Sequence, residues 1–369
     1  MNSIPLVDLA AQHRAIASEV AHAWQEVVSE TAFIGGRQVR AFEREFADFI
    51  GAGHCIGVAN GTDAIEIALR ALGVGKGHEC ILPANTFIAT AEAVFRAGAT
   101  PVLVDCADDG GYLIDPDAVE AAVTSQTRAV IPVHLYGQAA AIERIAPLAK
   151  RNGIHIVEDA AQAQGALRNG VRAGVLGDVA ATSFYPGKNL GAYGDAGAVL
   201  TSSDELAAKV RLISDHGSAV KYRHDVIGLN SRLDTLQAAV LSAKLRRLDD
   251  WNSARRVAAA RYNAMLADVE DVMIPRTLPG NEHVWHLYVV QVPDRDRIIK
   301  ELHSVGIGAG IHYPVPIHLT PAAADLGYAD GSFPVAERAA DHLLSLPIFP
   351  EITEGQQESV VAALQAALR

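Results

Sequence analysis

Cysteine is scarce in this sequence, and long apolar runs are absent. The three cysteines among 369 residues (Cys55, Cys80 and Cys106) stand far apart, with no CxxC pair. Such a sparse, odd set excludes a disulfide framework and predicts reduced thiols in a cytoplasmic protein. The sequence contains no stretch of about 18 apolar residues, so we expect no membrane span. The N-terminus has Asp8 and no long apolar core, so we do not expect a signal peptide.

Positive charge is also in short supply. The formal net charge is −12 and half of the residues are hydrophobic, which is the composition of a globular chain with a sizeable core. The negative balance argues against nucleic acid or an anionic membrane as a general partner. An anionic small molecule would need a local site made of basic side chains or backbone N–H groups.

Several widespread catalytic and binding motifs are missing as well. Gly187-Lys188-Asn189 lacks the Ser or Thr that follows the lysine of a P-loop, and no GxGxxG follows the first predicted strand. No GxSxG nucleophile elbow occurs. His283 and His286 have no cysteine or carboxylate at metal-ligand spacing, so we expect structural histidines and no metal site.

What the sequence does contain is an alternation of short apolar runs and helical patterns. Apolar runs bounded by turns and separated by helices predict βαβ units around a parallel sheet. The fold class we expect is therefore α/β, with a large three-layer domain around a mostly parallel sheet. The predicted strands cover 55–59, 79–83, 101–105, 129–135, 154–158 and 198–201.

Beyond residue 201 the rhythm changes. The pattern predicts one long helix from Arg232 to Ala267, which would join a large unit to a smaller one. We expect a large domain over 1–249 and a smaller C-terminal α+β domain over 250–369.

One lysine of the seven stands in an unusual setting. Lys188 follows an apolar run and is flanked by Phe184, Tyr185 and Leu190, whereas the other six lie in polar helices or turns. Desolvation disfavours the charged form of an amine and lowers its pKa, and such an amine can attack a carbonyl. The same residue could equally be a loop lysine that reaches water.

Two further stretches follow predicted strands. In Asn60-Gly61-Thr62-Asp63, a glycine and a hydroxyl begin a helix, which suits a phosphate group. A plain capping turn would look the same. Asp159 follows the strand 154–158, where it could hold a heterocyclic nitrogen in its protonated form or simply cap the next helix.

The three stretches gain meaning when they are taken together. Ligands of parallel α/β sheets bind at the carboxyl ends of the strands, so Gly61, Asp159 and Lys188 are expected to converge. A phosphate site, an acidic partner for a ring nitrogen and a reactive lysine are the three requirements of pyridoxal 5′-phosphate (PLP). We therefore predict PLP as the cofactor.

The chain as a whole resembles the PLP-dependent nucleotide-sugar aminotransferases of the DegT/DnrJ/StrS type, within the fold-type I superfamily. The matching stretches keep the family's order along nearly the whole length. They are FIGG (33–36), NGTDA (60–64), PANTFIATA (83–91), PVHLYGQ (132–138), EDAAQAQGA (158–166), SFYPGKNLGAYGD (183–195), NSRLDTLQAA (230–239), VWHLYV (284–289), GIHYPVPIH (310–318) and LSLP (344–347).

The resemblance implies roles for individual residues. Lys188 would bind PLP as a Schiff base and then shuttle a proton. Asp159 would bind the pyridine nitrogen, Gln162 the phenolic oxygen, and Phe87 would stack on the ring. The phosphate would be held by Gly61, Thr62 and Ser183, with Asn230 donated by a second subunit of an obligate homodimer.

The resemblance also implies a substrate side and a reaction. His312 and Tyr313 would contact the substrate and would also be donated across the dimer, and Tyr185 and His318 complete the expected set. L-glutamate would supply the amine by a ping-pong route, and a nucleotide-linked ketosugar would accept it. One branch of the fold carries His in place of the lysine and dehydrates sugars, which Lys188 argues against.

Two stretches favour a particular sugar. GIHYPVPIH and KNLGAYGD resemble members that aminate C3 of a dTDP-3-keto-6-deoxyhexose. The alternatives are a 4-keto sugar, a UDP-linked sugar or, in a different class, a non-catalytic regulator that binds nucleotide sugars. Ala196 stands where the family often has a second glycine, so the loop conformation there is open.

Overall fold

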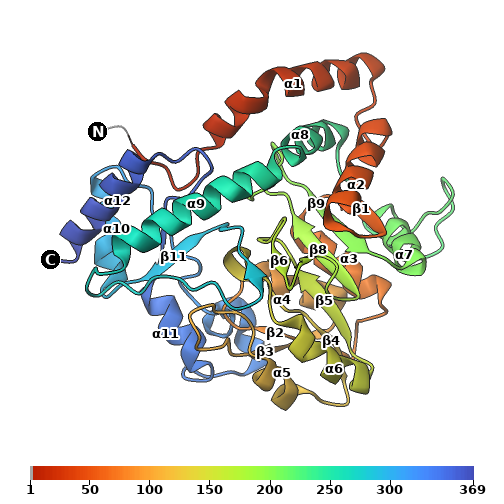
Figure 1. Ribbon diagram of the computed structural model, residues 1–369. Coiled ribbons are helices and arrows are strands. Elements are labelled where there is room, and N and C mark those ends of the chain that lie inside the picture. The colour runs from red at the N-terminus through yellow and green to blue at the C-terminus, as the bar shows by residue number, and fades with distance from the viewer. Residues whose placement is uncertain (1–2) are drawn as a thin grey trace.

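The computed structural model describes residues 3–369, whose largest element is a seven-stranded sheet (Figure 1). The strand order is β1-β9-β8-β5-β4-β2-β3, and only β9 runs antiparallel to its neighbours. The predicted α/β class with a mostly parallel sheet is confirmed. The strands are β1 (His54–Val58), β2 (Glu79–Pro83), β3 (Thr100–Val104), β4 (Thr127–Val130), β5 (His155–Asp159), β8 (Val179–Ser183) and β9 (Gly197–Thr201).

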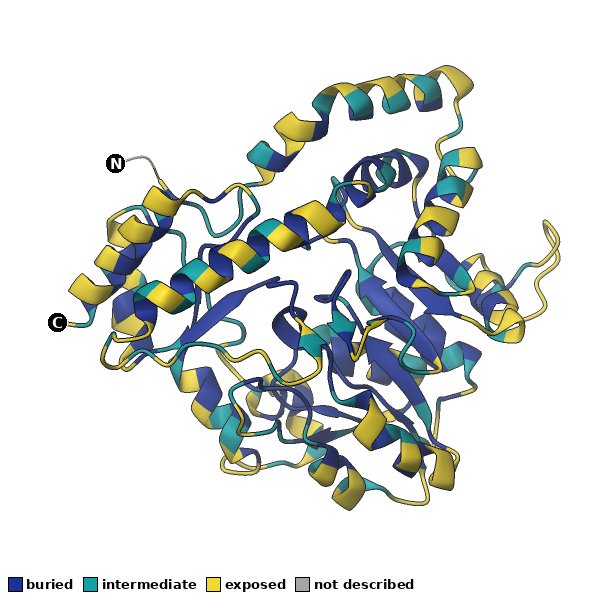
Figure 2. Cartoon of the chain, in the orientation of Figure 1, coloured by how far each residue is buried: buried dark blue, intermediate teal, exposed yellow. Residues whose placement is uncertain are grey.

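Alternating side chains of the strands bury both faces of this sheet. In β2, Leu82 packs with the helices α3 and α4, whereas Ile81 packs with α5 and α6 on the other face. Figure 2 shows the strands as buried, with exposed residues on the outer sides of the helices. These helices are α3 (Gly61–Ala71), α4 (Ile88–Ala97), α5 (Pro116–Ala122) and α6 (Ile142–Asn152). Three more helices pack near β1: α2 (Arg37–Ile50), α7 (Asp204–Ser214) and α8 (Thr235–Leu245).

A second hydrophobic cluster is built mainly from the C-terminal part of the chain. It combines α9 with a two-stranded antiparallel sheet and two further helices, and Ile4 from the N-terminal segment joins it. The elements are α9 (Leu248–Leu266), β11 (Tyr288–Gln291), α10 (Arg295–Ser304), β12 (Leu343–Leu346) and α12 (Glu354–Ala367). The helix α11 (Pro334–His342) packs with the cluster of the large sheet instead, and α1 (Leu9–Glu30) packs on α8. The two-domain division at residue 249 remains a prediction, since α9 runs through that point.

The remaining elements are short. A three-stranded ribbon consists of β6 (Leu167–Arg168), β7 (Val171–Arg172) and β10 (Asn281–Glu282). Three 3-10 turns are η1 (Leu135–Gly137), η2 (Ile317–Leu319) and η3 (Pro321–Leu326). No helix within 3–369 combines the length and apolarity that crossing a bilayer requires.

The single long helix predicted over 232–267 is wrong. The chain forms α8 and α9 instead, with a break at Arg246 and Arg247 (Figure 1). Both arginines form ion pairs with Glu19 of α1. A contact more than 200 positions away in the sequence therefore accompanies the break, and no glycine or proline marks it locally.

The sheet brings the three predicted ligand-binding stretches to one edge. β1 and β8 are both antiparallel to β9, so they run in the same direction as each other and as β5. The carboxyl ends of β1, β5 and β8 therefore lie at the same edge, and they lead into Gly61, Asp159 and Lys188 respectively.

Candidate active site

A cavity of ≈ 590 Å³ lies at this edge of the sheet. It is lined from the large sheet, from the segment before β11, from the loop after α10 and from Leu6 and Val7 near the N-terminus. Ten of the twelve predicted site residues line it: Gly61, Thr62, Phe87, Asp159, Gln162, Ser183, Tyr185, Lys188, His312 and Tyr313.

Lys188 lies in this cavity rather than at the outer surface. Part of its side chain faces the cavity, but the surrounding protein excludes enough water to lower the pKa of the amine to about 8. The negative charge of Asp159 acts in the opposite direction and raises that pKa. At neutral to mildly alkaline pH, a useful fraction of the amine is therefore uncharged and nucleophilic.

Asp159 is held by hydrogen bonds at both carboxylate oxygens. Thr90 Oγ1 donates to Oδ2 at 2.8 Å, and the backbone N–H of Ala161 donates to Oδ1 at 3.1 Å. The side chain is 5% exposed. These contacts fix an acidic group in the cavity at the end of β5, where it can face a protonated ring nitrogen.

Gln162, Tyr313 and Phe87 form a connected wall of the cavity. Gln162 Oε1 accepts from the N–H of Tyr136 at 2.6 Å, and its Nε2 donates to the Tyr313 hydroxyl at 3.1 Å. The Phe87 and Tyr313 rings are 5.3 Å apart between centroids. The amide is thus oriented from both ends, and two aromatic faces border the space beside it.

The start of α3 forms a cradle against Ser183. Asn60 caps the helix by accepting from the N–H of Asp63 at 2.8 Å, while the N–H groups of Gly61 and Thr62 have no partner within the helix. A Cβ on Gly61 would lie 2.7 Å from Ser183 Cβ. Only glycine allows so close an approach, which leaves backbone N–H groups and hydroxyls facing an anion.

Gly61→Ala is therefore expected to weaken cofactor binding without unfolding the chain. Relieving the clash with Ser183 would move the helix start, at a cost of about 1–3 kcal/mol, or roughly a 5- to 150-fold weaker affinity. Gly355→Ala in α12 is the matched control, since nothing lies within 4 Å of a Cβ there. PLP titration by fluorescence quenching measures the affinity of each variant for the cofactor. Equal affinities for the two variants would contradict the assignment of Gly61 to the phosphate site.

The structure corrects one expectation about the substrate side. His312 and Tyr313 line the cavity of their own chain, so the expectation that a second subunit donates them is wrong. His312 Nδ1 is 2.8 Å from Ser345 Oγ, and burial together with Lys188 lowers the pKa of His312 to about 4. The ring is therefore neutral under ordinary conditions.

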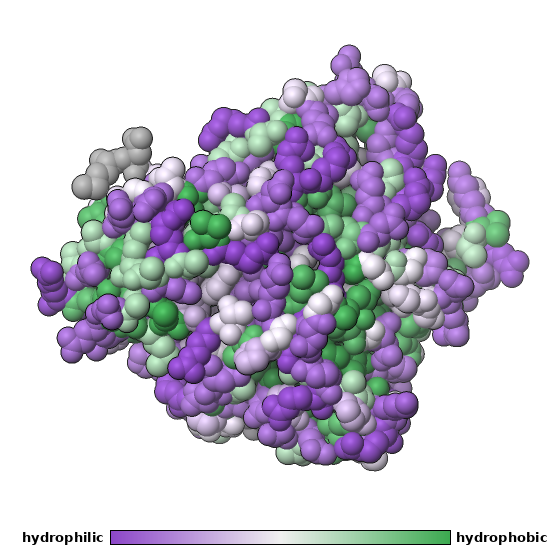
Figure 3. Space-filling model, in the orientation of Figure 1, coloured by the Kyte–Doolittle hydropathy of each residue, from purple (hydrophilic) through white to green (hydrophobic). Residues whose placement is uncertain are grey.

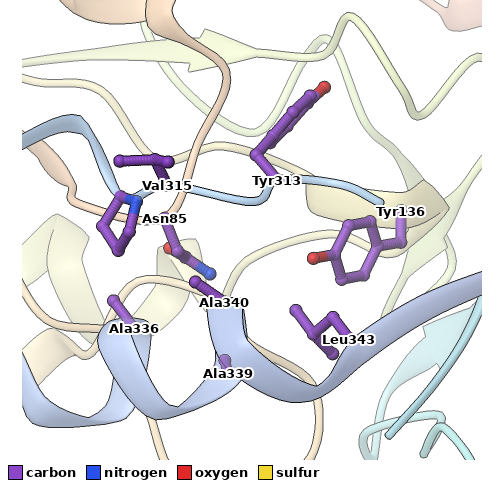
Figure 4. Close-up of a pocket in the computed structure, with 9 residues that line it drawn as sticks. Asn85, Tyr136, Tyr313, Val315, Ala336, Ala339, Ala340 and Leu343 are labelled. Atoms are coloured by element: carbon purple, nitrogen blue, oxygen red, sulfur yellow. The ribbon is translucent and has the colours of Figure 1, made fainter. Parts of the chain in front are cut away.

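A smaller cavity lies behind these residues. Figure 4 shows Tyr313 and Tyr136 around it, with Asn85 and Leu343 nearby. The Tyr136 hydroxyl donates to the backbone carbonyl of His312. This packing supports the His312–Tyr313 segment from the side away from the main cavity.

Two predicted residues lie outside the cavity lining. His318 is buried and its Nε2 is 2.8 Å from Glu337 Oε1, in a setting where the ring packs against Phe333. Asn230 is exposed and forms an isolated bridge with Asp215, away from its own chain's cavity. The assignment of His318 to substrate is therefore not favoured by its position, whereas the role of Asn230 in a second subunit stays a prediction.

Some lining residues were given no place in the site from the sequence, among them His286, which was expected to be purely structural. They are Thr90, which orients Asp159, the N-terminal Leu6 and Val7, Asp195 and His286. Thr90 stands three residues after Phe87 within the PANTFIATA stretch, so a one-turn helical spacing could have indicated it. Nothing local in the sequence indicates that Leu6 or His286 returns to this edge.

Comparison with known proteins agrees with this geometry. A sequence model of the DegT/DnrJ/EryC1/StrS aminotransferase family matches residues 14–365. The chain belongs to this family. It is accordingly a PLP-dependent aminotransferase.

Three proteins illustrate how similar the chain is to other members of the family. A pleiotropic regulatory protein of Geobacillus stearothermophilus is 49% identical over 361 residues, covering 97% of each chain. The dTDP-3-amino-3,4,6-trideoxy-alpha-D-glucose transaminase of Streptomyces venezuelae is 45% identical over 362 residues, covering 98% of this chain and 95% of the relative. The crystal structure of S. venezuelae DesV with a ketimine intermediate superposes with a TM-score of 0.97 at 44% identity, covering both chains completely.

The groups present in the cavity fit the cofactor of this aminotransferase family. The cavity offers an amine of lowered pKa at Lys188, a fixed carboxylate at Asp159 and a helix start that a Cβ at Gly61 would obstruct. When bound, PLP supplies the electron sink that allows an amino group to be exchanged for a carbonyl.

Proposed function

We propose that this enzyme transfers an amino group from L-glutamate to a nucleotide-linked ketosugar, namely a dTDP-3-keto-6-deoxyhexose, in the cytoplasm. The observation that carries the proposal is the meeting of Lys188, Asp159 and the start of α3 in one large cavity. The chain's similarity to a dTDP-amino-sugar transaminase gives the class of sugar.

Each residue that lines the cavity has its own role in this proposal. Lys188 binds PLP through Nζ and moves a proton to and from the reacting carbon. Asp159 keeps the ring nitrogen protonated, and Gln162 orients the ring oxygen. Phe87 covers the ring face, while the N–H groups of Gly61 and Thr62 and the hydroxyl of Ser183 bind the phosphate. Substrate contacts fall to three further lining residues: Tyr185, His312 and Tyr313.

A second subunit is part of the proposal because the cavity is poor in positive charge. Among residues 3–369, Lys188 is the only lysine or arginine that lines it, and two acids, Asp159 and Asp195, line it as well. A nucleoside diphosphate and a dicarboxylate donor both carry negative charge. We therefore infer that a second subunit supplies cations to the cavity.

The loop that follows α7 has the properties that this contribution requires. Within 216–230, the side chains of Tyr222 and Ile227 are 84% and 89% exposed. Figure 1 shows the loop projecting beside α7, and Figure 3 shows hydrophobic atoms in it among hydrophilic ones. Lys221, Arg223 and Asn230 belong to this segment, so pairing with a second copy would cover apolar surface and supply both cations and Asn230.

Mixing two inactive variants tests the shared site. Lys188→Ala and Asn230→Ala homodimers should each be impaired, but in a mixed dimer one site would combine native Lys188 with native Asn230. Co-expressed, differently tagged subunits purified through both tags should therefore regain about half of the native activity per dimer. An active monomer in sedimentation, or mixed dimers without recovery, would contradict the shared site.

The sugar is tested in a single half-reaction. The amine-loaded enzyme, prepared with L-glutamate and freed of it, should regain its visible absorbance with a dTDP-3-keto sugar and release an amino sugar detectable by mass spectrometry. The 4-keto isomer and the UDP-linked 3-keto sugar are matched controls, expected to react at least about tenfold more slowly. Faster reaction with either control would reassign the substrate. Binding of the sugar without amine transfer would favour the alternative that the protein is a non-catalytic regulator that binds nucleotide sugars.

A further inference from the structure

Tyr313 is a cavity residue whose hydroxyl has a single hydrogen-bond partner within residues 3–369. That partner is the side-chain amide of Gln162, whose Nε2 lies 3.1 Å from the Tyr313 oxygen. A phenol hydroxyl can donate or accept, and an amide has a donor end and an acceptor end. The direction of this contact therefore decides what the hydroxyl offers to a bound ligand.

The backbone of Tyr136 fixes that direction. Its N–H group lies 2.6 Å from Gln162 Oε1. A backbone N–H can only donate, so the amide atom that faces it must be the oxygen. The other end of Gln162 is then the NH2 group, which donates to the Tyr313 hydroxyl. Because the Tyr313 oxygen accepts this bond, its own hydrogen points elsewhere.

The Tyr313 hydrogen has no acceptor in the part of the chain that the structure describes, and the side chain lines the cavity. Gln162 lines the cavity as well, and its NH2 group has a second hydrogen to donate. The two side chains thus offer two hydrogen-bond donors from neighbouring atoms. An oxygen that carries negative charge is the ligand group that such a pair of donors stabilises most.

The segment that carries Tyr313 is held on both sides of this residue. Before it, the Tyr136 hydroxyl donates to the backbone carbonyl of His312. After it, the Ile317 N–H donates to the Ala84 carbonyl at 2.9 Å. Tyr136 therefore acts twice, since its backbone orients the amide that meets Tyr313 and its side chain holds the preceding peptide.

We propose that Tyr313 donates its hydroxyl hydrogen to the phenolic oxygen of PLP, beside the hydrogen bond that Gln162 gives to the same oxygen. The O–H bond stays intact, so no proton is transferred. The ring nitrogen and the phenolic oxygen stand close together on the pyridine ring. Asp159 and Gln162, three residues apart at the end of β5, suit these two atoms. Tyr313 is then a cofactor-binding residue in addition to its proposed contact with substrate.

The surroundings keep the Tyr313 hydroxyl protonated. Burial raises its pKa above the usual value of a tyrosine, and the negative charge of Asp159 raises it further. The hydrogen bond from Gln162 lowers the pKa by a smaller amount. The donor therefore persists throughout the pH range in which Lys188 changes its charge.

The inference rests on the proposed placement of the phenolic oxygen beside Gln162, and not on the identity of the sugar or the amino donor. Two ligands isolate this oxygen: pyridoxamine 5′-phosphate and its 3-deoxy analogue, which lacks it. Neither has the aldehyde that reacts with Lys188, so their binding reports non-covalent contacts. The readout is the dissociation constant of each ligand for the full-length, cofactor-free protein, measured by fluorescence quenching.

Three variants are compared with the native protein. Tyr313→Phe removes the proposed donor and keeps the ring, and Gln162→Leu removes the neighbouring one. Tyr288→Phe is the matched control, because the Tyr288 hydroxyl donates to Asn263 Oδ1 at 2.8 Å, outside the cavity lining. We expect Tyr288→Phe to bind both ligands as the native protein does.

Tyr313→Phe is expected to bind pyridoxamine 5′-phosphate about 10- to 100-fold more weakly than the native protein does. Its affinity for the 3-deoxy analogue should stay within about twofold of native, which also shows that the variant is folded. Equal losses for both ligands, or no loss for either, would overturn the inference if Gln162→Leu still weakens pyridoxamine 5′-phosphate alone.

Failure of the underlying placement looks different. If the native protein binds the two ligands equally and Gln162→Leu changes both affinities alike, the phenolic oxygen meets neither donor. That result would overturn the proposed role of Gln162 and the inference with it. The covalent role of Lys188 would be unaffected, because it is tested by the reducible band.

Discussion

Replacing Lys188 with alanine is expected to abolish amine transfer, with a rate loss of at least about 10⁴-fold. The amine of Lys188 has a pKa lowered to about 8, and it is the only primary amine that lines the cavity within 3–369. Its loss removes both the covalent attachment of PLP and the group that moves the proton. The measurements are the transamination rate and the visible band that borohydride removes.

Lys244 provides the matched control for this prediction. It is another buried lysine, 2% exposed, and burial lowers its pKa to about 8 as well. It lies on α8 with Nζ 5.1 Å from the centroid of the Tyr193 ring, outside the cavity lining. Lys244→Met should keep the reducible band and most of the activity. A reducible band in Lys188→Ala, or its loss in Lys244→Met, would contradict the assignment.

Asp159→Asn is expected to reduce the rate of amine transfer about 10³-fold while the visible band persists. Asparagine keeps an acceptor oxygen for Ala161 or Thr90 but carries no charge, so it cannot hold a ring nitrogen in the protonated form. The electron sink is then weakened although PLP still reaches Lys188.

The same substitution has a second consequence, at Lys188. The charge of Asp159 raises the pKa of that amine, so removing it should lower the pKa further below about 8. Labelling of Lys188 in the PLP-free chain, followed against pH by mass spectrometry, measures the change. Thr90→Val is the control, since it removes one hydrogen bond but leaves the carboxylate charged. Equal effects of the two variants on rate and pKa would show that the charge is not what matters.

The sequence predicted the core of the site because three local signals stand at strand ends. Gly61 and Lys188 each follow an apolar strand and Asp159 ends one, and the geometry of parallel sheets brings such ends together. What could not be predicted is how β1 joins the others. β9 inserts between β1 and β8 and runs antiparallel to both, and no local pattern specifies that neighbour.

Residues placed by long-range contacts were the ones missed or misplaced. His312 and Tyr313 were expected from a second subunit, but the loop after α10 folds back over the cavity of its own chain. The direction of the Tyr313 hydroxyl depends on Gln162 and Tyr136, which come from separate parts of the sequence. The break between α8 and α9 coincides with ion pairs to Glu19 rather than with a helix-breaking residue.

The most direct test of the account is to locate the cofactor in the chain. PLP-loaded native protein is reduced with borohydride, digested and analysed by peptide mass spectrometry. We expect one stoichiometric pyridoxyl phosphate adduct, on the peptide that contains Lys188, and an unmodified peptide for Lys244. A stoichiometric adduct on Lys244 or any other lysine, with Lys188 unmodified, would contradict the central claim.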